Sequence, residues 1–155
     1  MRDTDRAKVY EAEWTAEKLF DCPGEAVKIH GSTIVIPAER KFGQVEDIQI
    51  YVDKVLAHIS KPLGIEVRKR KGAKKAHYEH DTNTIAIPDS DWSRREIVVL
   101  HEIAHALAPG DHHGAKFRKA YVDLMTSVLG HEAGFILSSS YFQFGLTLAP
   151  ESDSL

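Results

Sequence analysis

Residues 93–114 carry the pattern His-Glu-x-x-His (HExxH) within a largely apolar run that begins at Ile97. On an α-helix, residues four positions apart are separated by about 40° around the axis and roughly 6 Å along it. His101 and His105 should therefore present their imidazoles from one face, at the spacing that one tetrahedral zinc ion requires. Glu102 is offset by about 100°, beside the coordination position left for water, and is the expected general base and acid.

The sequence around this pattern indicates a buried helix. Ser93 and Glu96 have the Ser-x-x-Glu spacing of a capping box, which predicts that the helix begins there. Nearly all the following positions are apolar, so the helix should be buried all round, and Pro109 and Gly110 should end it. Polar side chains in such a segment cost free energy unless they have partners, which a metal ion would supply. The alternative is that the two histidines are hydrogen-bonded core residues.

A catalytic zinc site takes three protein ligands and leaves a fourth position open. With a single cysteine, Cys22, the chain can form no internal disulfide, and the site must be built from histidine and carboxylate. Spacing alone leaves four candidates for the third ligand: Asp111, His112, His113 and Glu132.

The segment from His101 to Gly130 resembles the SprT-like zincins. Their motif continues from HExxH through a short loop to His-Gly, two further residues and an aromatic residue that opens a helix. Here that second part is His113-Gly114-Ala115-Lys116-Phe117, so the resemblance implies that His113 is the third zinc ligand. The chain also resembles a smaller family described as metallohydrolases of bacteria and bacteriophage, which begins with an RDxQRxxVYxAE-like segment. Residues 2–13 match that segment, with Asp5 in place of glutamine.

Hydrophobic periodicity predicts an α+β fold. Helices besides the HExxH helix are expected at residues 4–21, with Thr4 or Asp5 as cap, and at 45–59, 115–129 and 132–148. Strands are expected at residues 65–70, 76–80 and 84–87, and at 26–36 as a strand pair or one bent strand. Together with the resemblance to zincins, this pattern predicts a single zincin-like domain, residues 1–150, followed by a disordered tail, residues 151–155. In it a small, mostly antiparallel sheet packs against the HExxH helix and further helices.

Charge and composition restrict the partners. The net charge of −3 at pH 7 gives no overall attraction for nucleic acid or membranes. A basic segment from Arg68 to Lys75 is first interpreted as a solvated hairpin turn, and alternatively as a contact for nucleic acid or an acidic substrate. No apolar run approaches membrane-spanning length, and the amino-terminal residues lack the apolar core of a signal peptide. We therefore expect a cytoplasmic protein with no membrane partner.

The sequence thus predicts a zinc-dependent hydrolase, most simply a metallopeptidase that cleaves a peptide bond in a peptide or protein substrate. Zn²⁺ would be held by His101, His105 and His113, with Glu102 as general base and acid. One alternative is a non-catalytic binding module whose zinc site is closed by Asp111 or His112 as a fourth ligand. Another is a DNA-associated protein that acts through the basic segment.

The sequence also contains candidates for oxyanion stabilisation, for substrate binding and for a second metal site. Tyr78 or Tyr121 would donate a hydrogen bond to the oxyanion. Residues 83–87 would form a sheet edge that pairs with an extended substrate. His77, His80 and Asp81 form a second, less favoured candidate for a metal cluster.

Overall fold

The computed structural model describes residues 5–72 and 74–151, and within them it confirms an α+β fold. The chain divides into two compact units, one made of Met1–Ala38 with Gly110–Leu155 and the other of Glu39–Pro109. The second unit is thus inserted into the sequence of the first, and the prediction of a single domain stays a prediction. None of the helices among the described residues is long and apolar enough to cross a membrane.

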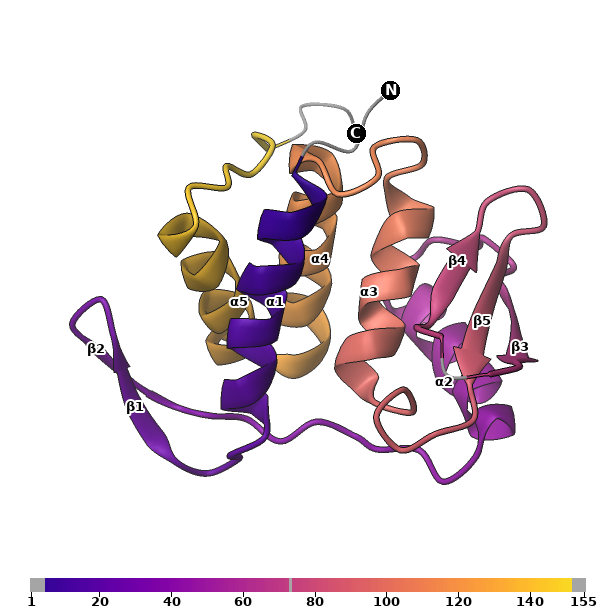
Figure 1. The fold of residues 1–155 in the computed structure, drawn as a ribbon, viewed down its shortest axis with the longest axis horizontal. Coiled ribbons are helices and arrows are strands. Elements are labelled where there is room, and N and C mark those ends of the chain that lie inside the picture. The colour runs from indigo at the N-terminus through magenta and orange to yellow at the C-terminus, as the bar shows by residue number, and fades with distance from the viewer. Residues whose placement is uncertain (1–4, 73, 152–155) are drawn as a thin grey trace. The chain divides into compact units, whose positions relative to one another are not determined.

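The first unit is built around three helices, α1 (Arg6–Phe20), α4 (Ala115–Leu129) and α5 (His131–Gln143). α5 packs against both α1 and α4 (Figure 1). The contact between α4 and α5 is close enough to require glycine, because a Cβ at Gly134 would lie 1.8 Å from the Thr126 hydroxyl oxygen. Two hydrogen bonds join α5 to α1: the Ser140 hydroxyl donates to the Ala12 carbonyl at 2.5 Å, and the Tyr141 hydroxyl donates to the Glu13 carboxylate at 2.6 Å.

The strands of this unit agree with the prediction, whereas its last helix is shorter than predicted. β1 (Ala26–Ile29) and β2 (Ser32–Val35) form an antiparallel hairpin, which confirms the strand pair. The predicted helix over residues 132–148 ends early, at Gln143, because Gly145 adopts a left-handed backbone with φ of 71°. Thr4, one of the two candidate caps, lies outside the described residues, as do all residues of the predicted tail except Glu151.

The second unit contains α2 (Val45–His58), β3 (Glu66–Arg70), β4 (His77–Glu79), β5 (Thr84–Pro88) and α3 (Glu96–Leu107). Its sheet has the order β3-β5-β4, with β5 parallel to β3 and antiparallel to β4 (Figure 1). The sheet is therefore mixed, where the sequence predicted a mostly antiparallel one. The reason is that β5 is buried along its whole length and takes the central position, so β3 and β4 pair with it from opposite sides.

The order of the strands also removes one predicted binding surface. Residues 83–87 were expected to offer a free sheet edge, and this is wrong, because both edges of β5 are already paired. The outer edge of β3 is covered as well. The Gln49 side chain from α2 donates to the Ile65 carbonyl at 3.0 Å and accepts the Val67 amide at 2.7 Å. The other edge strand, β4, packs beside α3.

The start of α3 differs from the predicted capping box. The cap position is occupied by Arg95, and no side chain there makes a capping hydrogen bond, so Ser93 does not cap the helix. Residues distant in sequence take over this task. The Ile97 amide donates to the Glu39 carboxylate at 3.1 Å, and the Glu96 amide donates to a backbone carbonyl of the same segment at 2.9 Å. The first turn of α3 is therefore held by residues some 56 positions earlier.

The Glu96 carboxylate has a structural role of its own. It accepts the Arg40 amide at 2.7 Å and the Tyr51 hydroxyl at 2.5 Å. Burial, followed by the hydrogen bond to Glu96, raises the pKa of Tyr51 well above its usual value. This buried network joins α2, α3 and the segment before α2, and so holds the first turn of α3, the helix that carries the HExxH residues.

Candidate metal centre

The two histidines of HExxH lie on one face of α3, as their spacing predicts. The rings of His101 and His105 meet edge to face, with centroids 5.0 Å apart, and both side chains are half-buried. Two imidazoles held this close on a rigid helix offer two nitrogen ligands from one element.

Glu102 lies beside the first of these histidines. Its side chain is buried, and one carboxylate oxygen lies 2.9 Å from Nδ1 of His101. Because a carboxylate oxygen can only accept, this contact favours the tautomer of His101 that has its proton on Nδ1 and its lone pair on Nε2. A carboxylate in this position sets the tautomer and the orientation of a metal-binding histidine. The predicted role of Glu102 as general base stays a prediction.

His113 lies in the loop between α3 and α4 and is 7% exposed. Its ring is contacted edge to face by Tyr10 from α1, at 5.1 Å between centroids, and by Phe117 from α4, at 5.2 Å. Its backbone carbonyl accepts a hydrogen bond from the Arg118 guanidinium at 2.6 Å. Both the side chain and the backbone of this residue are thus held by neighbouring elements.

His101, His105 and His113 form a group that could hold a metal ion. Each offers one ring nitrogen, and these ligand atoms all lie within 4.8 Å of one another. Three neutral imidazoles suit zinc, although they also suit other first-row transition metals. The structure therefore brings the three predicted ligands together, and the identity of the metal stays a prediction.

The other candidates for the third ligand do not belong to this group. The Asp111 carboxylate instead accepts the Phe117 amide at 2.9 Å, and so satisfies a first-turn amide of α4. His112 is exposed, with a left-handed backbone (φ of 55°), and Glu132 is exposed at the start of α5. These placements also remove the support for a closed site with Asp111 or His112 as fourth ligand.

The structure explains why glycine follows His113. A Cβ at Gly114 would lie 2.7 Å from one Asp111 carboxylate oxygen and 2.9 Å from the other. The position of Asp111 that satisfies the Phe117 amide therefore leaves no room for a side chain at residue 114. The candidate ligand His113 is thus followed by a residue without a side chain, which leaves room for the Asp111 carboxylate.

The tyrosines predicted to stabilise an oxyanion have structural partners. The Tyr78 hydroxyl donates to the Asn83 side chain at 2.6 Å, and burial raises the pKa of Tyr78. Tyr121 is buried beside Phe117. A role for either in catalysis stays a prediction. Tyr10 was not selected from the sequence, where its only signal was the match of residues 2–13 to a family segment without an assigned role.

The remaining predicted features lie apart from the histidine group. His77, His80 and Asp81 are exposed and do not join it. In the basic segment, Arg68 forms an ion pair with Glu79, and Lys69 lies within 4.0 Å of two carboxylates, those of Glu46 and Asp89. The predicted hairpin turn is wrong, because Arg68 and Lys69 belong to β3, and β3 and β4 each pair with β5 rather than with one another. Nucleic-acid binding stays a prediction.

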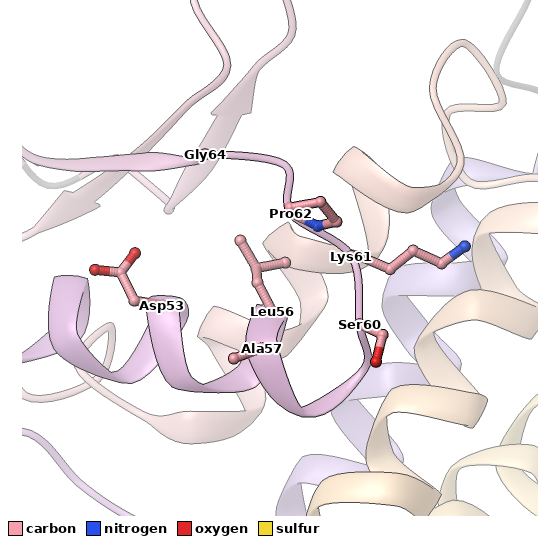
Figure 2. Close-up of a pocket in the computed structure, with 7 residues that line it drawn as sticks. All are labelled: Asp53, Leu56, Ala57, Ser60, Lys61, Pro62 and Gly64. Carbon is pink, nitrogen blue, oxygen red and sulfur yellow. The ribbon is translucent and has the colours of Figure 1, made fainter.

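A pocket lies at the end of α2, within the second unit (Figure 2). Leu56 and Ala57 of α2 line it together with the chain that follows the helix, around Pro62 and Gly64. None of the residues predicted to act in catalysis or metal binding lines this pocket, so it does not extend the candidate metal centre.

Comparison of the chain with protein-family models, with curated proteins and with solved structures finds no match. The metal centre therefore rests on the residues and their geometry. The resemblance to SprT-like zincins rests on the HExxH and His-Gly motifs.

Proposed function

We propose that this protein is a zinc-dependent hydrolase of the SprT-like zincin type that cleaves peptide bonds in a peptide or protein substrate. The observation that carries the proposal is the group of three histidine ligand atoms within 4.8 Å of one another, with Glu102 next to one of them. Three histidines leave a coordination position for water or substrate, as catalytic zinc sites require.

The residues divide the chemistry between them. His101, His105 and His113 would hold the ion, which would supply Lewis-acid chemistry near neutral pH. Glu102 would accept a proton from the attacking water and deliver it to the departing amine nitrogen. Its burial on a rigid helix keeps the carboxylate in place for both transfers.

The activity test compares the zinc-loaded wild type with Glu102→Gln on an unfolded protein substrate, with products identified by mass spectrometry. We expect cleavage by the wild type and, in Glu102→Gln, full zinc content with turnover lower by about 10²-fold or more, because the proton carrier is gone. Glu132→Gln is the matched control, since this exposed glutamate lies outside the histidine group, and it should cleave normally.

Two results would contradict the proposal. If the zinc-loaded wild type cleaved no peptide bond, the peptidase activity would be wrong. If Glu102→Gln lost its zinc, Glu102 would be a ligand, and its assignment as proton carrier would be wrong.

A further inference from the structure

Arg118 is a buried cation next to the third ligand. Its side chain is 3% exposed, and its guanidinium donates four hydrogen bonds to three separate segments. One goes to the His113 carbonyl at 2.6 Å, two go to the Thr147 carbonyl at 3.0 and 2.7 Å, and one goes to the Asp5 carboxylate at 3.1 Å. Burying a cation costs free energy unless it is paired, so a guanidinium that uses its donors this fully holds these segments in one arrangement.

The loop that carries His113 needs such an anchor. The preceding residue, His112, has a left-handed backbone (φ of 55°), a conformation that only a few per cent of residues other than glycine adopt, although histidine adopts it more often than most. The backbone of residue 113 is fixed by Arg118, and its ring lies against Phe117, the neighbour of Arg118 on α4. One turn of α4 therefore fixes both the carbonyl and the imidazole of the ligand.

We propose that Arg118 is a positioning residue of the metal centre, which fixes the backbone of His113 and couples it to the start of α1. This inference rests on the metal site of the proposed function. Asp5 at the cap of α1 supplies the opposite charge, and Tyr10, five residues later, touches the imidazole itself. Through these contacts α1 helps to hold His113 in place. The motif in residues 2–13 had no assigned function.

Arginine is specifically suited to this position. The planar guanidinium points its donors in several fixed directions and can reach three segments at once. A lysine at position 118 would bring one ammonium group, which cannot keep the same set of acceptors. Charge alone should therefore not restore the function of this residue.

The test is Co²⁺ binding, because tetrahedral cobalt gives visible absorption bands that report both affinity and geometry. The wild type, Arg118→Gln, Arg118→Lys and Asp5→Asn are titrated as metal-free proteins. Arg94→Gln is the matched control. Arg94 is also a largely buried arginine, and its guanidinium binds Phe42, Asp89 and Asp91.

We expect one Co²⁺ per wild-type chain, and an affinity about 10- to 100-fold weaker in Arg118→Gln, the usual effect of removing a group that orients a metal ligand. The cobalt bands of Arg118→Gln should also change in intensity. Arg118→Lys should stay at least fivefold weaker than the wild type, Asp5→Asn should be weakened to a smaller extent, and Arg94→Gln should bind within twofold of the wild type.

The outcomes separate this inference from the proposed function. A wild type that binds no Co²⁺ or Zn²⁺ overturns both. A wild type that binds, together with Arg118→Gln of equal affinity and identical bands, overturns the positioning role alone. A lower melting temperature with unchanged affinity and bands would show that Arg118 serves only the fold. If Arg118→Gln does not fold, wild-type affinity in both Arg118→Lys and Asp5→Asn overturns the proposal instead.

Discussion

At the scale of single residues, the candidate metal centre combines two histidines of one helix with a third, His113, whose carbonyl and ring are held by Arg118 and Tyr10. The sequence predicted His101, Glu102 and His105 because a helix fixes their spacing. His113 could be chosen over Asp111 and His112 only through a family resemblance. The difference between these neighbours lies in contacts that spacing does not reveal, such as the bond from the Phe117 amide to Asp111. The supporting residues Tyr10 and Arg118 were missed because their partners are distant in sequence.

Gly114→Ala tests the packing that accompanies the third ligand. The added Cβ would overlap the Asp111 carboxylate, and we expect a loss of about 1–3 kcal/mol in the free energy of unfolding, measured by urea denaturation. In an Asp111→Ala background the obstacle is absent, so the same substitution should cost less than half as much. An equal cost in both backgrounds would mean that the carboxylate does not limit residue 114.

At the scale of elements, the sequence predicted which segments are helices and strands better than it predicted their neighbours. Periodicity located α3 and β5, because it reports which faces of a segment are buried. It did not show that β5 would be central, or that Glu39 rather than Ser93 would satisfy the first turn of α3. Both outcomes depend on tertiary contacts between segments that local patterns treat separately.

The start of α3 should depend on Glu39 and not on Ser93. The Glu39 side chain is buried and accepts hydrogen bonds from the Ile97 amide and the Arg95 guanidinium, so Glu39→Ala should lower the free energy of unfolding by about 3 kcal/mol. Ser93 is fully buried, and its hydroxyl has no hydrogen-bond partner within residues 5–72 and 74–151. Ser93→Ala should therefore change stability by less than about 0.5 kcal/mol, or raise it. Chemical denaturation of both variants measures these changes. A large loss of stability in Ser93→Ala would mean that the Ser93 hydroxyl does cap α3.

At the scale of the whole molecule, two buried tyrosines make stability depend on alkaline pH. Burial, followed by a neighbouring glutamate, raises the pKa of Tyr51 in one unit and of Tyr141 in the other. Below pH 10 both tyrosines are protonated in the folded and unfolded states, so their contribution is fully present. Above pH 10 the unfolded chain loses these protons while the folded chain keeps them, and stability falls by about 1.4 kcal/mol per pH unit for each tyrosine.

Denaturation of the wild type and Tyr141→Phe between pH 9 and 11 measures this effect. The variant should lose stability less steeply above pH 10, because one of the two protons no longer contributes. Equal slopes for the two proteins would show that Tyr141 ionises in the folded state as readily as in the unfolded one.

Native mass spectrometry measures whether His101, His105 and His113 together hold one metal ion. The wild type, His113→Ala and the control His112→Ala, a change at the exposed neighbour, are purified without added metal and weighed intact. We predict one zinc per chain in the wild type and in His112→Ala, and zinc absent or much more weakly held in His113→Ala. Full zinc in His113→Ala would contradict the three-histidine site, as would a wild type that takes up no metal even when zinc is supplied.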